Sequence, residues 1–261
     1  MASSNKGKQT LEDHYAALNL QNDDDEEVDL PFGELNMEDP EVESFMLVGT
    51  LITEKSVKFN YLKETLSKVW RPMKGMVAKE ISTNLFIFYF FHEKDRRRVM
   101  ENSPWSFDQS LLVLRELEHN ESPYNIDLTK AEFWVQIHKL PQRLSNPQMV
   151  EALGFFFGEF LKTDPTNFDG TMTAFVRVRV RMDIAKPRRR NVKFKPPGEE
   201  GMALDCKYER LPTFCFVCGR LGHADGFCPI QFDAQFEMPR AYGPELRATG
   251  RSGQNSDNKW L

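Results

Sequence analysis

The sequence predicts an α+β protein in which two small domains precede a short loop rich in cysteine and histidine. Three observations lead to this fold class. In the first half of the chain, the spacing of apolar residues alternates between that of strands and that of helices. A second, shorter set of predicted strands and a helix follows. Three cysteines and a histidine then fall within 14 residues. The expected segments are a disordered acidic segment (1–43), a first α+β domain (44–118), a linker (119–130), a second α+β domain (131–212), the Cys/His loop (213–229) and a disordered tail (230–261).

The net charge of −5 averages two unlike parts of the chain. Residues 1–44 carry 2 Lys/Arg and 13 Asp/Glu, whereas residues 171–196 carry nine Lys/Arg and one Asp. Such a concentration of cations indicates a surface that attracts polyanions. The sequence has no apolar run near 18 residues and no apolar segment at its start, so we expect neither a membrane span nor a signal peptide. A reducing nuclear or cytoplasmic location is expected, where cysteines remain thiols.

The first domain is expected to hold six elements in the order βαββαβ. This is the ferredoxin-like order, in which two helices cover one face of a four-stranded antiparallel sheet and the other face is left open. A helix is indicated where Leu62, Leu66 and Val69 share one face, and it should end at Arg71-Pro72. The predicted elements are strand 45–53, helix 60–70, strands 76–82 and 85–91, helix 93–102 and strand 110–116.

The strand at 84–90 is apolar on both faces. Phe86, Phe88 and Phe90 alternate with Leu85, Ile87 and Tyr89. The run is weakly similar to the base-stacking strand of RNA-recognition modules, but the basic residues of that signature are missing. We therefore prefer cover by another domain, or by Trp105 and its loop.

The second domain is expected to contain strand 132–140, helix 146–159, a short strand at 160–163, and strands 173–182 and 202–211. In the strand at 173–182, Val176, Val178, Val180 and Met182 should face the core. The opposite face would present a row of arginines that continues into a basic run, which could also serve as a nuclear-localisation stretch. The candidate phosphate contacts are Arg177, Arg179, Arg181, Arg188, Arg189 and Arg190.

The Cys/His loop has the spacing Cys-x2-Cys-x4-His-x4-Cys, formed by Cys215, Cys218, His223 and Cys228. Thiolates and imidazole are the ligands that tetrahedral zinc prefers, and four protein ligands leave no open position for catalysis. The sequence therefore predicts one structural Zn²⁺. Cys206, the fourth cysteine, is expected to be a strand thiol outside the site.

Three residues of the loop are candidate base contacts. Phe216 and Phe227 have little protein to pack against within a loop of this size, and Arg220 lies between them. Exposed aromatic rings of this kind can stack on unpaired bases, although packing against the preceding domain is the alternative. The loop closely resembles the zinc knuckle of retroviral nucleocapsid proteins and retroelement gag-like proteins. That resemblance implies binding of single-stranded nucleic acid. The knuckle's own contact with bases is expected to be weak, because Ala224 replaces the bulky apolar residue that usually follows the histidine.

From about residue 44 to residue 229 the layout resembles the gag-like first protein of plant LINE-type (non-LTR) retrotransposons and the host genes derived from them. Nucleic-acid binding is inferred for that family, and no activity is assigned to its first domain. The matching residues are Phe133-Trp134-Val135, Leu140-Pro141, Phe175-Val176-Arg177-Val178-Arg179-Val180, Lys186-Pro187, Tyr208-Glu209-Arg210-Leu211-Pro212 and the zinc knuckle.

The leading interpretation is a non-catalytic, zinc-dependent protein that binds single-stranded nucleic acid, with RNA favoured over DNA. The alternative is a protein-interaction module that docks partners through the knuckle and the first domain. Catalysis is not expected, because the sequence shows no nucleophile–histidine–acid order, phosphate-binding glycine loop or paired carboxylates.

Overall fold

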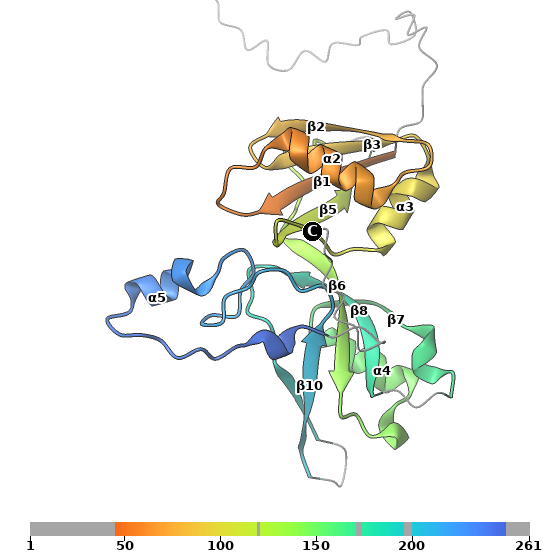
Figure 1. The fold of residues 1–261 in the computed structure, drawn as a ribbon. Helices are drawn as coiled ribbons and strands as arrows, with labels where there is room; N and C mark the ends of the chain where they lie inside the picture. The colour runs from red at the N-terminus through yellow and green to blue at the C-terminus, as the bar shows by residue number, and fades with distance from the viewer. Residues whose placement is uncertain (1–44, 119–120, 171–173, 196–199, 249–261) are drawn as a thin grey trace, which may run out of the picture. The chain divides into compact units, whose positions relative to one another are not determined.

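The computed structural model describes residues 45–118, 121–170, 174–195 and 200–248. The acidic segment 1–43 and residues 249–261 lie outside the described residues. Two antiparallel five-stranded sheets organise the described chain, with few helices beside them (Figure 1). The predicted α+β class is therefore confirmed. Within the described residues, no helix has the length and apolar character needed to cross a membrane.

The first sheet has the strand order β2-β3-β1-β5-β4. Its four main strands keep the ferredoxin-like arrangement, and the short β4 adds an edge strand that pairs with β5 through a tight hairpin. The sequence did not predict β4, which has only three residues and no clear alternation. The elements are β1 (Phe45–Ile52), α2 (Phe59–Trp70), β2 (Met76–Ser82), β3 (Leu85–Phe90), α3 (Glu93–Glu101), β4 (Trp105–Phe107) and β5 (Ser110–Glu116).

The two helices of this domain begin and end at residues with local physical reasons. Helix α2 buries Leu62, Leu66 and Trp70, and it ends where Arg71 adopts a left-handed conformation before Pro72. His92 caps the N-terminus of helix α3, and its side chain accepts a hydrogen bond from the Lys94 amide. Both helices pack on the sheet face that carries the three phenylalanines of β3, which are fully buried. Those rings are therefore unavailable for base stacking.

The opposite face of the first sheet is covered mainly by other parts of the chain. Leu111 and Val113 of β5 belong to the hydrophobic core of the second sheet. Ile126 and Leu128, from the segment expected to be a free linker, pack beside Ile87 of β3. Cover by another domain was the preferred expectation, and it holds at β5, whereas the face of β3 packs against the linker segment and Trp105 lies on the helix side against Trp70.

The second sheet has the strand order β7-β8-β6-β10-β9. Its central pair, β6 and β8, stays in register along the full length of both strands. Val150 and Leu153 of α4 pack into the core that the valines of β8 help to form. The elements are β6 (Lys130–His138), α4 (Pro147–Phe155), β7 (Glu159–Thr163), β8 (Phe175–Asp183), β9 (Asn191–Phe194) and β10 (Met202–Tyr208).

The C-terminal segment corrects the expectation of a disordered tail. Residues 229–248 contain α5 (Pro229–Asp233) and a short 3₁₀ turn (Pro244–Leu246). Leu246 is 1% exposed within the second core, and the Ala248 amide donates to the Tyr208 carbonyl of β10. One buried leucine and one strand-like contact are enough to anchor a segment that has no regular apolar periodicity, which is why the sequence indicated disorder.

Candidate zinc site and cationic surface

The four predicted zinc ligands converge on one point. The sulfur atoms of Cys215, Cys218 and Cys228 and one ring nitrogen of His223 all lie within 4.8 Å of one another. Ligands held about 2.0–2.3 Å from a tetrahedral zinc ion lie roughly 3.5–3.8 Å apart, so the cluster fits that ion with little adjustment. The donor set and its spacing make this a site for one structural Zn²⁺, as predicted.

The backbone around the cluster is arranged for metal binding. The Cys218 amide donates to the Cys215 sulfur over 3.4 Å, and the Gly219 amide donates to the Cys215 carbonyl over 2.8 Å. Gly219 has a φ of +72°, a left-handed backbone conformation that glycine adopts without the steric strain of a side chain. Burial raises the pKa of the Cys215 thiol to about 12, so metal binding must displace its proton.

Cys206 lies outside this cluster, as expected. It is buried on β10 and pairs opposite Ile137 of β6. Burial raises the pKa of its thiol to about 12, and its sulfur donates weakly to the Leu204 carbonyl. A protonated thiol in a strand is a packing group.

The zinc loop is joined to the second sheet and to the C-terminal segment. Phe214 and Leu221 are part of the second core, and the Arg188 amide donates to the Gly219 carbonyl over 2.8 Å. The Tyr242 ring lies so close to Gly219 that a Cβ atom there would be 2.4 Å from it. These contacts fix the orientation of the knuckle on the sheet.

The two knuckle phenylalanines differ in exposure. Phe216 packs partly into the second core and lies edge-on to Phe214 at 5.0 Å. The expected stacking role of Phe216 is therefore not supported, and the packing alternative describes its position. Phe227 is 72% exposed, and Arg220 and Ala224 are exposed as well.

The arginine row of β8 corrects the sequence prediction of a free phosphate-binding face. The alternation is as predicted, because Val176, Val178, Val180 and Met182 are buried in the core. Four carboxylates from other parts of the chain, however, pair with the arginine face. The ion pairs are Arg177 with Asp164 and Glu209, Arg179 with Glu132, and Arg181 with Glu132 and Glu159.

Arg179 is the most enclosed member of this row, with 3% exposure. Its guanidinium donates to the Met100 and Glu101 carbonyls at the C-terminal end of α3 and to the Ser103 hydroxyl. A cation at a helix C-terminus is favourable because the free carbonyls carry partial negative charge. Arg179 thus connects the two sheets of the compact unit Glu43–Leu261 and is not available to a phosphate.

The basic run after β8 forms part of a cationic depression. The depression has a volume of about 790 Å³. Arg188 lies buried in its wall, donates to the Asp183 and Lys186 carbonyls, and has an Nε without a partner among the described residues. Arg189 and Arg190 are exposed at its rim, and Arg190 lies 5.3 Å from the Tyr242 ring. The cations that line it are Lys130, Arg181, Lys186, Arg188, Arg189 and Arg190, against the carboxylates Glu159 and Asp183.

Sequence reasoning missed three contributors to this surface. Phe155 and Phe156, at the end of α4, are 61% and 51% exposed and line the depression. Tyr242 connects it to the zinc loop, because its amide donates to the Phe216 carbonyl over 2.9 Å. The sequence predicted a helix to about residue 159, whereas α4 ends at Phe155, and no role was assigned to the two phenylalanines.

Two family models match the chain. Residues 40–125 match a model described as a domain of unknown function (DUF4283), and residues 182–230 match one described as a zinc knuckle. The "Uncharacterized protein At4g02000" of Arabidopsis thaliana is 26% identical over 137 residues. The match covers 52% of this chain and 43% of that relative, so it spans less than half of the relative's length. A DUF4283 domain followed by a zinc knuckle is typical of plant retrotransposon-like, gag-like proteins, and this chain has that arrangement.

Proposed function

We propose that this protein is a non-catalytic, zinc-dependent binder of single-stranded nucleic acid. The observation that carries the proposal is the junction between the zinc knuckle and the cationic depression. Arg188 bonds to the knuckle backbone, and Tyr242 contacts both Gly219 and Arg190. A strand bound at the knuckle would therefore have cations for its phosphates beside it.

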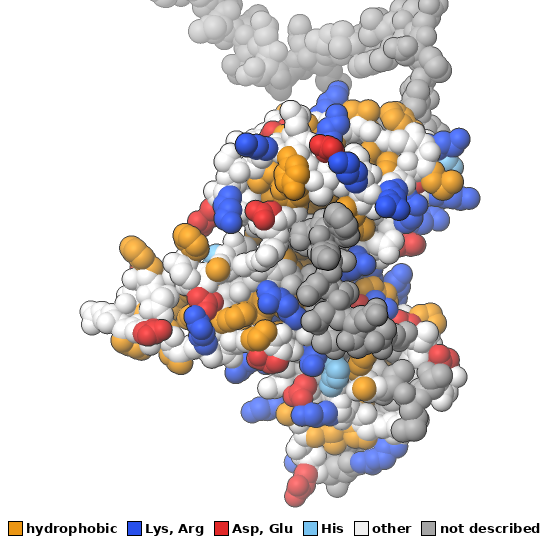
Figure 2. Space-filling model, in the orientation of Figure 1, with side chains coloured by type: hydrophobic (Ala, Val, Ile, Leu, Met, Phe, Trp, Pro, Cys, Tyr) orange, Lys and Arg blue, Asp and Glu red, His pale blue; other side chains and the backbone are white. Residues whose placement is uncertain are grey.

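The exposed groups suggest a division of roles. Lys186, Arg189 and Arg190 are exposed and would hold phosphates, which supplies affinity without sequence preference. Phe227 would stack on a base and Arg220 would contact its edge or phosphate. Figure 2 shows basic side chains close to hydrophobic ones on the visible face of the described chain. RNA is the ligand we favour, with DNA as the second probe.

The described histidines support a non-catalytic role, because each has a structural contact. His92 caps α3, His138 lies against Phe175 at 5.0 Å, and His223 belongs to the zinc cluster. Within the described residues the sulfur contact of His223, 3.3 Å from its Nε2 to Cys218 Sγ, joins two zinc ligands, so neither group is free to act in catalysis when the metal is bound. We further propose a LINE-type retrotransposon origin and a reducing intracellular location, since the knuckle requires free thiols.

The test measures the affinity of the zinc-loaded full chain for a fluorescent single-stranded oligonucleotide across a salt series. We expect Arg189→Gln/Arg190→Gln to weaken binding to all sequences alike and to lower the salt slope by about 1–2 units, because two phosphate contacts are lost. The matched control is Lys74→Gln/Lys94→Gln, which removes two exposed charges from the first domain and should leave the slope unchanged.

A second variant tests the base contact. Phe227→Ala should cost about 1–3 kcal/mol of binding and alter base preference while leaving the salt slope unchanged. If the wild-type protein binds no single strand, the proposal is wrong. Retention of a protein ligand with little dependence on salt would instead favour the alternative, in which the knuckle and the first domain dock a protein partner.

A further inference from the structure

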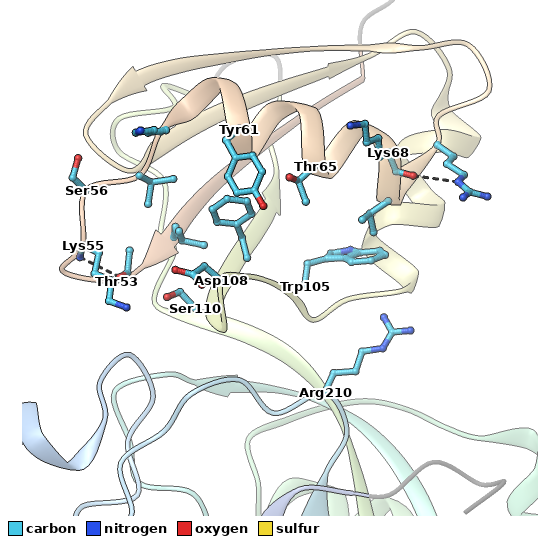
Figure 3. Close-up of a pocket in the computed structure, with 16 residues that line it drawn as sticks. Thr53, Lys55, Ser56, Tyr61, Thr65, Lys68, Trp105, Asp108, Ser110 and Arg210 are labelled. Atoms are coloured by element: carbon cyan, nitrogen blue, oxygen red, sulfur yellow. Dashed lines mark hydrogen bonds between the residues drawn. The ribbon is translucent and has the colours of Figure 1, made fainter. Parts of the chain in front are cut away.

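A groove in the first domain is lined by chemistry that the proposed function does not use. It has a volume of about 1280 Å³ and opens between α2, the loop that follows β1, and the β4–β5 hairpin (Figure 3). Arg210 reaches it from the chain after β10. Neither the zinc site nor the cationic depression contributes a residue to its lining.

The lining of this groove is strongly cationic. Five cations line it against one carboxylate, that of Asp108. Lys55 and Lys58 are exposed, and no ion pair engages either within the described part of the chain. Unpaired cations on one rim attract an anionic ligand. The cationic residues are Lys55, Lys58, Lys68, Arg71 and Arg210.

Two aromatic side chains stand in the same opening. Tyr61 is 64% exposed and is held edge-on against Phe107, with ring centroids 5.4 Å apart. Trp105 is fixed more firmly, because its indole nitrogen donates to the Val99 carbonyl over 2.8 Å. The Arg210 guanidinium lies 5.6 Å from the Trp105 ring. Figure 3 shows Tyr61, Trp105 and Arg210 directed into the groove from different elements.

This combination selects among anionic ligands. An acidic peptide would use the cations but would leave the exposed tyrosine and the indole without a role. A base paired in a duplex has no free face to stack on either ring, whereas an unpaired base does. Hydroxyl groups of Thr53, Ser56, Thr65 and Ser110 also line the groove and can bond to a sugar, a phosphate or a base edge.

We propose that this groove is a second binding site for single-stranded nucleic acid, in which an unpaired base stacks on Tyr61 beside Trp105. Lys55, Lys58 and Arg210 hold the adjacent phosphates. This inference rests on the proposed function, because both require a single-stranded ligand, but it assigns the binding to the first domain. A free nucleotide carries the same base and phosphate as a strand, so the test must distinguish a bound strand from a bound nucleotide.

The experiment uses the zinc-loaded full chain and a fluorescent oligouridine of about 12 nucleotides, a length within the usual range of single-strand binding sites. Tyr61→Ala should weaken binding about tenfold with an unchanged salt slope, because a stacking contact is lost. Lys55→Gln/Lys58→Gln should lower the salt slope by about 1–2 units. The matched control is Lys63→Gln/Lys94→Gln, whose residues are exposed in the same domain but do not line the groove.

Photocrosslinking gives a readout that does not depend on the folding of a variant. We expect the wild-type oligonucleotide adduct to include peptides that contain Tyr61 or Trp105. Wild-type affinity in both groove variants, with weakened binding in Arg189→Gln/Arg190→Gln, would overturn this inference and leave the proposed function intact. If wild type binds no single strand, both fall. Saturable binding of free UMP that Tyr61→Ala abolishes, with unchanged oligonucleotide affinity, would assign the groove to a free nucleotide and overturn the strand assignment.

Discussion

Two arginines of the basic stretch, Arg179 and Arg189, have opposite surroundings. Arg179 is 3% exposed and has its guanidinium occupied by Glu132 and by backbone carbonyls of α3. Arg189 is exposed. The strand alternation predicted which arginines share a face, but it could not reveal that acids distant in sequence cover that face. Charge along a chain therefore identifies candidate contacts, and three-dimensional pairing decides which of them are free.

The first prediction contrasts these two arginines. Arg179→Gln should lower the free energy of unfolding by about 3 kcal/mol, because it removes one partner of an enclosed ion pair and leaves helix carbonyls without a donor. Arg189→Gln should change stability by less than about 0.5 kcal/mol, as expected for an exposed site. Urea unfolding followed by circular dichroism measures both. Equal stability of the two variants would contradict the pairing described for Arg179.

Asp164 gives the arginine face a dependence on pH. Burial alone would raise the pKa of Asp164, but hydrogen bonds from Thr166 and Arg177 outweigh it and lower the pKa to about 2. A carboxylate whose pKa is lower in the folded state stabilises the fold above its ordinary pKa. That stabilisation is lost as pH falls from about 4 toward 2.

The second prediction follows from this shift. Asp164→Asn should keep the turn that begins at residue 164, since asparagine also caps turns, but should cost about 2 kcal/mol at pH 7. Its unfolding free energy should then fall less steeply than that of wild type below pH 4. Asp233→Asn, which alters an exposed carboxylate in α5, is the control. If the unfolding free energies of Asp164→Asn and wild type changed with pH in the same way, the lowered pKa of Asp164 would be contradicted.

At the scale of elements, periodicity predicted the long strands and both helices of the first domain. It failed where an element is short or is held by a few distant contacts. Strand β9 has four residues within a basic run, so charge concealed it, although Val192 is 3% exposed. Residues 229–248 also escaped prediction, because their apolar residues follow no regular period although Leu246 enters the second core. The zinc ligands were predictable because their spacing is local.

The third prediction tests the anchoring of the C-terminal segment. Leu246→Ala should destabilise the protein by about 2–4 kcal/mol, because it empties a site in the second core. Phe236→Ala alters a residue of the same segment that is 67% exposed and should cost less than about 0.5 kcal/mol. Thermal unfolding of the two variants provides the comparison. A stable Leu246→Ala protein would mean that the segment is not part of the folded unit in solution.

At the scale of the molecule, the zinc knuckle is a shared component of the fold. Its residues Phe214 and Leu221 belong to the second core, and a Cβ atom at Gly222 would lie 2.8 Å from the side chain of Ile52 in β1. The sequence indicated that the knuckle follows directly on the last strand of the second domain, with packing against that domain as an alternative, but it gave no sign of the contact with β1 of the first sheet. Loss of zinc should therefore reach beyond the four ligands.

The fourth prediction concerns removal of the metal. The purified chain should contain one zinc ion, and Cys218→Ser should lose it, whereas Cys206→Ala should retain it because Cys206 lies outside the cluster. Binding at such a site is worth on the order of 10 kcal/mol near neutral pH, so chelation should unfold the loop. Hydrogen exchange should then accelerate in residues 213–229 and at Tyr242 and Ala248, which bond to the knuckle and to β10.

The two sheets should respond less, because each has a core of its own side chains that needs no metal. Slow exchange of amides in β1, β3, β6 and β8 after chelation is therefore the expected result, with partial acceleration near Ile52, where the knuckle contacts the first sheet. Unchanged exchange at Tyr242 and Ala248 would show that the C-terminal segment is anchored independently of the metal. Global unfolding would show that zinc holds the two sheets together. Either result would contradict the prediction that loss of zinc loosens the knuckle and the C-terminal segment but leaves the two sheets folded.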